Sequence, residues 1–283
     1  MYRDTYPEAL SSLLRHIAKE TTANVATVPL QISSFTDERL AQCPFVYINL
    51  DARKWEFSPE EGTALKRYLE NGGFLLIDAG ITASFLRGTR FAQHHSFAEW
   101  DAAPEIKTAF AQLFPETSFI PLRRTDPIFR TFYQGLPDAS LLPDTVRDYV
   151  VQEKWPDGTY SAVALRLNGR IAVLCTPIIA MGWGRNSLGQ WLGNIQFRVL
   201  ESAKGIDESL QNAAYSGERF EVVREDGAKD VLYCQERALP AWCHEANGHW
   251  RVFRYYSSSE INDFAHTFYT RLGTNILLYA LLQ

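Results

Sequence analysis

The 283-residue chain has no long hydrophobic run and no excess of positive charge. No apolar stretch approaches the roughly 20 residues that a membrane-spanning helix needs, so we expect no membrane span. The 28 Lys and Arg residues are outnumbered by 33 Asp and Glu residues, which gives a formal net charge of −5. Basic patches are the footprint of nucleic-acid binding, and acidic surfaces are repelled by anionic lipids. We therefore expect neither nucleic acid nor a membrane as a partner.

Cysteine is also scarce, and the four residues show no regular spacing. Cys43 and Cys175 lie in or beside apolar segments and are expected to be small core residues. Cys234 and Cys243 lie near two histidines, but their spacing matches no standard zinc pattern. We therefore predict no metal and no cofactor. Pairing of Cys234 with Cys243 stays open, because a disulfide would depend on export of the protein.

The first ten residues, MYRDTYPEAL, lack the charged segment followed by an apolar run that marks a signal peptide. We therefore expect a cytoplasmic protein, or a periplasmic one if a leader preceded this sequence. Internal repeats and low-complexity stretches are missing, and 46% of the residues are hydrophobic. This composition is that of a globular protein and excludes a disordered chain.

The clearest local pattern is a strand–helix–strand unit. Residues 45–50 form an apolar run of strand length, as expected for a strand covered on both faces. The helix that follows begins with a capping box, in which Ser58 is the N-cap and Glu61 the third helical residue. Residues 74–78 form a second buried strand. Because a helical crossover joins parallel strands, we predict that the two strands are parallel and adjacent, or nearly adjacent, in a mostly parallel sheet.

A hairpin and a long helix complete the predicted main core. Residues 162–167 and 170–175 flank Asn168-Gly169, which is the strongest two-residue signal for a β-hairpin. From about Glu260, apolar residues recur at helical spacing almost to the C-terminus, which predicts a long amphipathic helix.

Between these elements the chain changes character. Residues 217–256 contain alternating strand-like runs separated by turn residues, which predicts a small antiparallel meander. We expect this sheet to lie within an insertion at 187–260 and to pack beside the main core, because roughly 40 residues rarely fold alone. Residues 1–283 would then form a single α/β domain.

Four phrases follow one another along the chain: FVYINLDARKWEFSPEEGTALKRYLENGGFLLID, DPIFRTFY, ALRLNGRIAVLCTP with GWGRN, and RLGTNILLYAL. In this order they resemble an uncharacterised bacterial family, a domain of unknown function in the class I glutamine-amidotransferase-like superfamily. Its members occur near MoxR-type ATPases and Bat aerotolerance proteins. The resemblance covers residues 5–186 and 265–282. It implies a three-layer, flavodoxin-like sheet between helices and no established activity.

Catalysis by a class I amidotransferase needs a cysteine on a tight turn after a strand, activated by a His and Glu pair. At the related place the chain reads Asp78-Ala79-Gly80, without a cysteine. Cys175 lies within a predicted strand, and no His-x-Glu pair follows it. We therefore predict no glutamine-amidotransferase activity and favour a protein that is not an enzyme.

A ligand site is predicted where the parallel strands end, because open α/β sheets bind ligands beyond the carboxyl ends of their strands. Carboxylates, guanidinium groups and an indole at this edge suit a polar or sugar-like ligand. The structural alternative is that Asp78 caps the next turn and that Asp126 only begins a turn. The predicted site residues are Asn49, Asp51, Arg53, Asp78, Arg124, Asp126, Trp183 and Arg185.

Two functions follow from these observations. The first is a non-catalytic module that binds a ligand or a protein partner, as part of an envelope-associated assembly that the family's gene neighbours imply. The second is a hydrolase acting on a sugar or an amide, with Asp78 and Asp51 as acid and base. A deep pocket around a carboxylate with a perturbed pKa would favour the enzyme.

Overall fold

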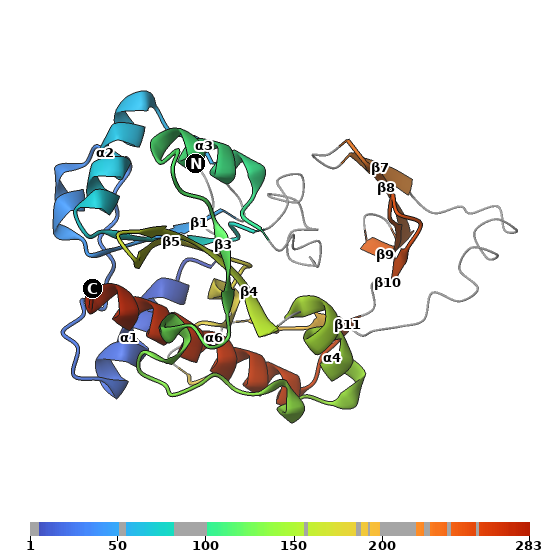
Figure 1. Ribbon diagram of the computed structural model, residues 1–283. Helices are drawn as coiled ribbons and strands as arrows, with labels where there is room; N and C mark the ends of the chain where they lie inside the picture. The colour runs from blue at the N-terminus through green and yellow to red at the C-terminus, as the bar shows by residue number, and fades with distance from the viewer. Residues whose placement is uncertain are drawn as a thin grey trace, which may run out of the picture.

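The computed structural model is built around a β-sheet with helices on both of its faces (Figure 1). It describes residues 6–50, 55–81, 101–155, 158–184, 188–191, 193–198, 219–223, 227–236, 239–252 and 255–283.

Within the described residues the main sheet has five strands in the order β1-β2-β5-β4-β3. Strands β1, β2 and β5 are mutually parallel, and β4 runs antiparallel to both β5 and β3. The sheet is therefore mostly parallel, with β4 as the reversed strand. The strand bounds are β1 (Phe45–Asn49), β2 (Phe74–Asp78), β3 (Ile120–Arg123), β4 (Thr159–Leu167) and β5 (Arg170–Thr176).

The predicted pairing of the first two strands is confirmed, since β1 lies beside β2 and parallel to it. The prediction that both strands are fully buried is wrong for β1. It is the edge strand of the sheet, and of its residues only Val46 is buried, whereas every residue of β2 is buried. An edge strand has one neighbour instead of two, so its side chains are less covered even when the sequence is apolar.

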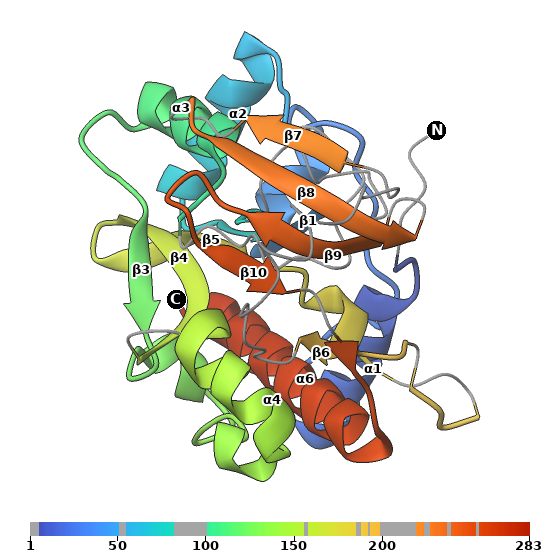
Figure 2. The ribbon, with the colours of Figure 1, turned by 90° about the vertical axis from the view of Figure 1, so that its right-hand side faces the viewer.

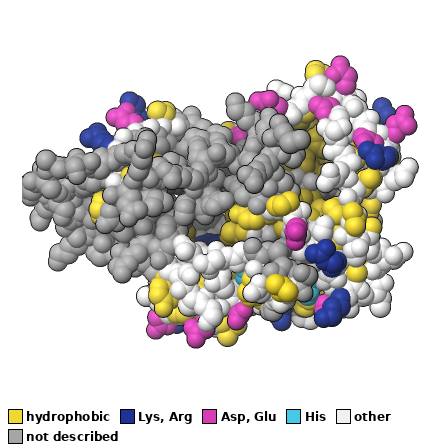
Figure 3. Space-filling view, turned by 180° about the vertical axis from the view of Figure 1, so that it is seen from behind, with side chains coloured by type: hydrophobic (Ala, Val, Ile, Leu, Met, Phe, Trp, Pro, Cys, Tyr) yellow, Lys and Arg dark blue, Asp and Glu magenta, His cyan; other side chains and the backbone are white. Residues whose placement is uncertain are grey.

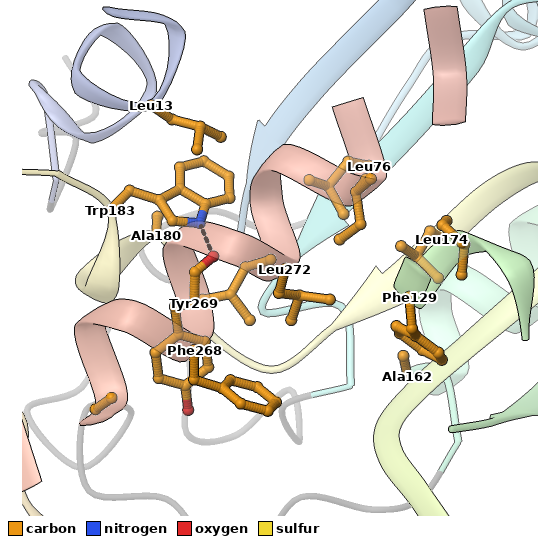
Figure 4. Close-up of a cluster of buried hydrophobic side chains, with 14 of the residues drawn as sticks. Leu13, Leu76, Phe129, Ala162, Leu174, Ala180, Trp183, Phe268, Tyr269 and Leu272 are labelled. Atoms are coloured by element: carbon orange, nitrogen blue, oxygen red, sulfur yellow. Dashed lines mark hydrogen bonds between the residues drawn. The ribbon is translucent and has the colours of Figure 1, made fainter. Parts of the chain in front are cut away.

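Two hydrophobic cores lie on opposite faces of the sheet, because successive strand side chains point to opposite sides. Phe74 and Leu76 of β2 belong to the core that contains α1 and α6, and Leu75 and Ile77 belong to the core that contains α2 and α3. Figure 4 shows part of the first core. The helix bounds are α1 (Ala9–Glu20), α2 (Pro59–Glu70), α3 (Pro104–Leu113), α4 (Asp144–Tyr149) and α6 (Ser259–Leu281).

The local signals predicted at helix and strand ends are present. Ser58 Oγ accepts a hydrogen bond from the Glu61 backbone N–H at 3.2 Å, and Glu61 accepts one from the Ser58 N–H at 2.9 Å, which completes the capping box. Asn168 and Gly169 both have positive φ, at 52° and 82°, as the tight hairpin between β4 and β5 requires. Short helical turns occupy η1 (Glu38–Gln42), η4 (Pro127–Arg130), η5 (Ala139–Leu141), η6 (Val150–Lys154) and η8 (Ala180–Gly182).

The predicted meander is present as a separate antiparallel sheet in the order β10-β9-β8-β7. Figures 1 and 2 show it on the side of the main sheet at which β1 and β2 end. The last predicted run is divided: β10 joins this sheet, but β11 pairs with β6, whose Phe197 is buried in the core beside α6. The bounds are β6 (Phe197–Arg198), β7 (Arg219–Val223), β8 (Lys229–Glu236), β9 (Leu239–His244), β10 (Trp250–Val252) and β11 (Tyr255–Tyr256).

The division of the chain into one domain, 1–283, with an insertion at 187–260, stays a prediction. No helix among the described residues combines the length and the apolar character that a bilayer span requires. On the face shown in Figure 3, the described acidic and basic side chains are interspersed around apolar ones.

Candidate functional site

The three parallel strands end side by side, and their last residues are in register. Asn49 of β1 is paired with Asp78 of β2, and Asp78 is paired with Thr176 of β5. Tyr47 of β1 joins them, since its hydroxyl accepts a hydrogen bond from Asn49 Nδ2 at 3.2 Å and donates one to Asp78 Oδ2 at 3.0 Å. The sequence therefore located this carboxylate correctly at the carboxyl edge of the sheet.

Asp78 is completely buried, with 0% of its surface exposed. Oδ1 accepts from the Ile179 N–H at 2.7 Å and from Thr176 Oγ1 at 3.3 Å, and Oδ2 accepts from the Ala180 N–H at 3.1 Å as well as from Tyr47. Burial raises the pKa of Asp78 from 3.8 to about 7, although the hydrogen bonds act in the opposite direction. The carboxylate fixes the turn between β5 and η8, and not the turn that follows it in sequence.

The backbone after Asp78 makes a tight turn. Ala79 has a φ of 62°, in the left-handed region that non-glycine residues seldom adopt, and its side chain is fully buried. A Cβ atom on Gly80 would lie 2.9 Å from the Ile77 carbonyl oxygen and 3.0 Å from the Cys175 Cβ atom. Close packing of β2 against β5 therefore requires glycine at position 80. The side chain of the preceding residue, Ala79, is a methyl group that is buried in the turn.

Trp183 lies near this network but is a core residue. Its side chain is 0% exposed, and the ring centroid lies 5.2 Å from that of Tyr47. Its indole Nε1 donates to the Tyr269 carbonyl oxygen on α6 at 3.1 Å, and Leu13 of α1 lies beside it (Figure 4). The predicted ligand contact of Trp183 is therefore not available on the described surface, and the indole connects the η8 turn to α6.

The structure places Arg124 and Asp126 apart from Asp78. Both follow β3, which is three strands from β2, or roughly 14 Å at the usual strand spacing. Arg124 donates to the Thr159 and Trp155 carbonyl oxygens at 3.0 and 2.8 Å. Asp126 forms an ion pair with Arg166 at 2.5 Å and caps η4. These two residues stabilise local structure, as the structural alternative for Asp126 predicted.

Three predicted site residues, Asp51, Arg53 and Arg185, lie outside the described residues. Their proximity to Asn49, to Asp78 or to each other stays a prediction.

Cys234 and Cys243 lie fully buried in the small sheet as thiols. They are on neighbouring strands, since Cys243 of β9 is opposite Leu232 of β8. Among the described residues, no group of three or more His, Cys, Asp or Glu side chains is placed to hold a metal ion.

A second region was not predicted from the sequence. A cavity of about 470 Å³ opens where the segment before β6 meets the first turns of α6. The only signal for it in the sequence is a tryptophan placed among small and amide residues in QWLGN, and no spacing rule connects that segment to a helix some 70 residues later. The lining residues are Trp191, Gly193, Asn194, Ser259, Asn262 and Asp263.

Fold and site together define a mixed α/β protein whose strand-end carboxylate is enclosed by its own chain. The chain belongs to the family described as "Domain of unknown function (DUF4159)", whose match spans residues 2–281. This match confirms the predicted resemblance to a family whose domain has no known function. No curated protein matches the chain.

Proposed function

We propose that this protein is a non-catalytic binding module whose α/β core serves as a scaffold. The proposal depends mainly on the surroundings of Asp78. A general acid or base must come within hydrogen-bond distance of its substrate. Asp78 has no exposed surface, and the donors around its two oxygens are the chain's own groups: Tyr47, Thr176 and the backbone N–H groups of Ile179 and Ala180.

A finer assignment of the fold belongs to the same proposal. We place the main sheet in the flavodoxin-like class and in the class I glutamine-amidotransferase-like superfamily. Support comes from the parallel order of β1, β2 and β5, from the helices on both faces, and from the tight turn at Ala79 where an amidotransferase needs its nucleophile. A shared fold does not by itself supply an activity.

The proposed partner is a protein or a polar, sugar-like ligand. Membership of an envelope-associated assembly rests on the sequence resemblance alone. A scaffold with an enclosed carboxylate is compatible with this role, because binding needs surface complementarity and no reactive group.

Hydrolysis of a sugar or amide is the second candidate, and one observation favours it. The pKa of Asp78 is raised to about 7, which is the range in which a carboxylic acid exchanges its proton at neutral pH. Structural carboxylates with buried hydrogen bonds show the same perturbation, so access to substrate decides between the two functions.

The test compares wild type with Asp78→Asn in hydrolysis assays with p-nitrophenyl glycosides, oligosaccharides and glutamine. We expect no turnover by the wild type above the level of the variant. Circular dichroism establishes that both proteins are folded. Turnover by wild type that a folded Asp78→Asn variant loses would establish the hydrolase and overturn the binding module.

A further inference from the structure

The cavity at the start of α6 has the size of a small-molecule site. Its volume is about 470 Å³, and it is a shallow depression that is largely open to solvent, so a ligand would lie against its floor. Its walls come from two segments, one around Trp191 and one comprising the first two turns of α6. A ligand there would contact groups that the fold holds in fixed positions from both sides.

Trp191 is held in place before any ligand arrives. Its ring is stacked on that of His266, with centroids 4.3 Å apart and an angle of 1° between the planes. Its Nε1 donates to Asp263 Oδ1 at 2.7 Å. His266 is itself fixed, because its two ring nitrogens lie 3.1 and 2.8 Å from the carbonyl oxygens of Gly182 and Gly193. Such preorganisation lowers the entropy cost of binding on an aromatic surface.

The amide groups of the cavity are ordered in the same way. Asn262 Oδ1 accepts from the Ile195 N–H at 2.7 Å, and its Nδ2 donates to Asn194 Oδ1 at 2.6 Å and to the Ser258 carbonyl oxygen at 3.1 Å. Both ends of the Asn262 amide are therefore engaged within the protein. Its role is to orient Asn194, whose own Nδ2 remains as a donor at the cavity.

The polar groups that remain available are one donor, one acceptor and one hydroxyl. Among the described residues, Asn194 Nδ2, Asp263 Oδ2 and Ser259 Oγ form no hydrogen bond or ion pair. The described residues that line the cavity include no Lys or Arg. A carboxylate without a neighbouring cation repels anions, and a simple amine would leave the amide donor of Asn194 without an acceptor. A hydroxyl group both donates and accepts hydrogen bonds, so a ligand with hydroxyl groups can pair with the Asp263 carboxylate and with the Asn194 amide donor.

We propose that this cavity binds a neutral pyranose unit of a glycan, with its C–H face on the Trp191 indole and its hydroxyl groups on Asp263 and Asn194. An indole provides a large apolar surface, and a carboxylate and an amide suit vicinal hydroxyl groups. The inference rests on the proposed binding function, which it deepens by naming a site and a class of ligand.

The test uses the full chain and three neutral oligosaccharides: cellotriose, maltotriose and triacetylchitotriose. Binding is followed by nuclear magnetic resonance of the indole N–H signals, with the Trp191 signal assigned from the Trp191→Phe variant. We expect at least one of the three to shift the Trp191 signal at millimolar concentration. We expect Asn194→Ala and Asp263→Asn each to weaken its binding about tenfold, as the loss of one hydrogen bond predicts.

The matched control is Asp148→Asn, another exposed helix aspartate, which should leave the affinity unchanged. Trp191→Ala should abolish binding, and Asn194→Ala keeps the test valid if Trp191→Ala does not fold. The site is refuted if none of the oligosaccharides shifts the Trp191 signal, or if binding survives in Asn194→Ala and Asp263→Asn at wild-type affinity. Release of reducing ends would instead contradict the proposed non-catalytic function and leave the sugar site standing.

Discussion

Replacing Asp78 with Asn should change how the stability of this protein depends on pH. The substitution keeps the shape and one oxygen acceptor, but it removes the titrating group and turns an NH₂ towards the backbone N–H of Ile179 or of Ala180. Two donors then face each other in a completely buried place. The loss of one satisfied hydrogen bond under these conditions costs about 1–3 kcal/mol.

The pH dependence follows from the shift of the Asp78 pKa. The unfolded chain releases this proton near its ordinary value of 3.8, whereas the folded protein releases it at about 7. Between these values the folded state binds more protons, so the contribution of Asp78 is fully present below the lower value and is lost as the pH rises through the upper one. One pKa unit corresponds to about 1.4 kcal/mol, which gives a loss of about 2 kcal/mol between pH 5 and pH 7.

The assay is urea unfolding of wild type and Asp78→Asn across this pH range, followed by tryptophan fluorescence. The free energy of unfolding of wild type minus that of the variant should fall by about 2 kcal/mol from pH 5 to pH 7. Other titrating groups cancel in this difference. Thr176→Val is the control, because it removes the 3.3 Å hydrogen bond but keeps the carboxylate, and so should keep the wild-type slope. A difference that stays constant with pH, or that increases, would refute the reasoning.

Two further substitutions test the packing around this site and on α6. Gly80→Ala should lower the free energy of unfolding by about 1–3 kcal/mol, because the added Cβ lies 2.9 Å from the Ile77 carbonyl oxygen. The control is Gly135→Ala, which should change the free energy of unfolding little, because nothing lies within 4 Å of the added Cβ. Equal costs in urea unfolding would contradict the packing argument. Asn275→Ala should cost about 3 kcal/mol or more, because Asn275 Oδ1 accepts from the Phe132 and Tyr133 N–H groups and Nδ2 donates to the Phe129 and Tyr133 carbonyl oxygens. The comparison is Asn247→Ala, at an exposed position. A similar melting temperature for the Asn275→Ala and Asn247→Ala variants would show that the Asn275 hydrogen bonds do not stabilise the segment at 129–133.

Short-range patterns of the sequence determined the local structure. The Ser58 capping box, the Asn168-Gly169 hairpin and the apolar run at 74–78 were all predicted correctly, because each depends on backbone sterics and hydrogen bonds within a few residues. The position of Asp78 at the carboxyl edge followed from the same kind of reasoning, since a helix between two strands makes them parallel.

The tertiary structure decided what those residues contact. Asp78 binds backbone N–H groups about a hundred residues later, at Ile179 and Ala180, and Trp183 lies buried against α6 instead of at the surface. The cavity at Trp191 likewise joins two segments about 70 residues apart. The sequence alone could not select these partners, because many long-range pairings satisfy the same local pattern. Only the simultaneous packing of both sheet faces, together with the hydrogen bonding of buried groups such as Asp78, distinguishes one of them.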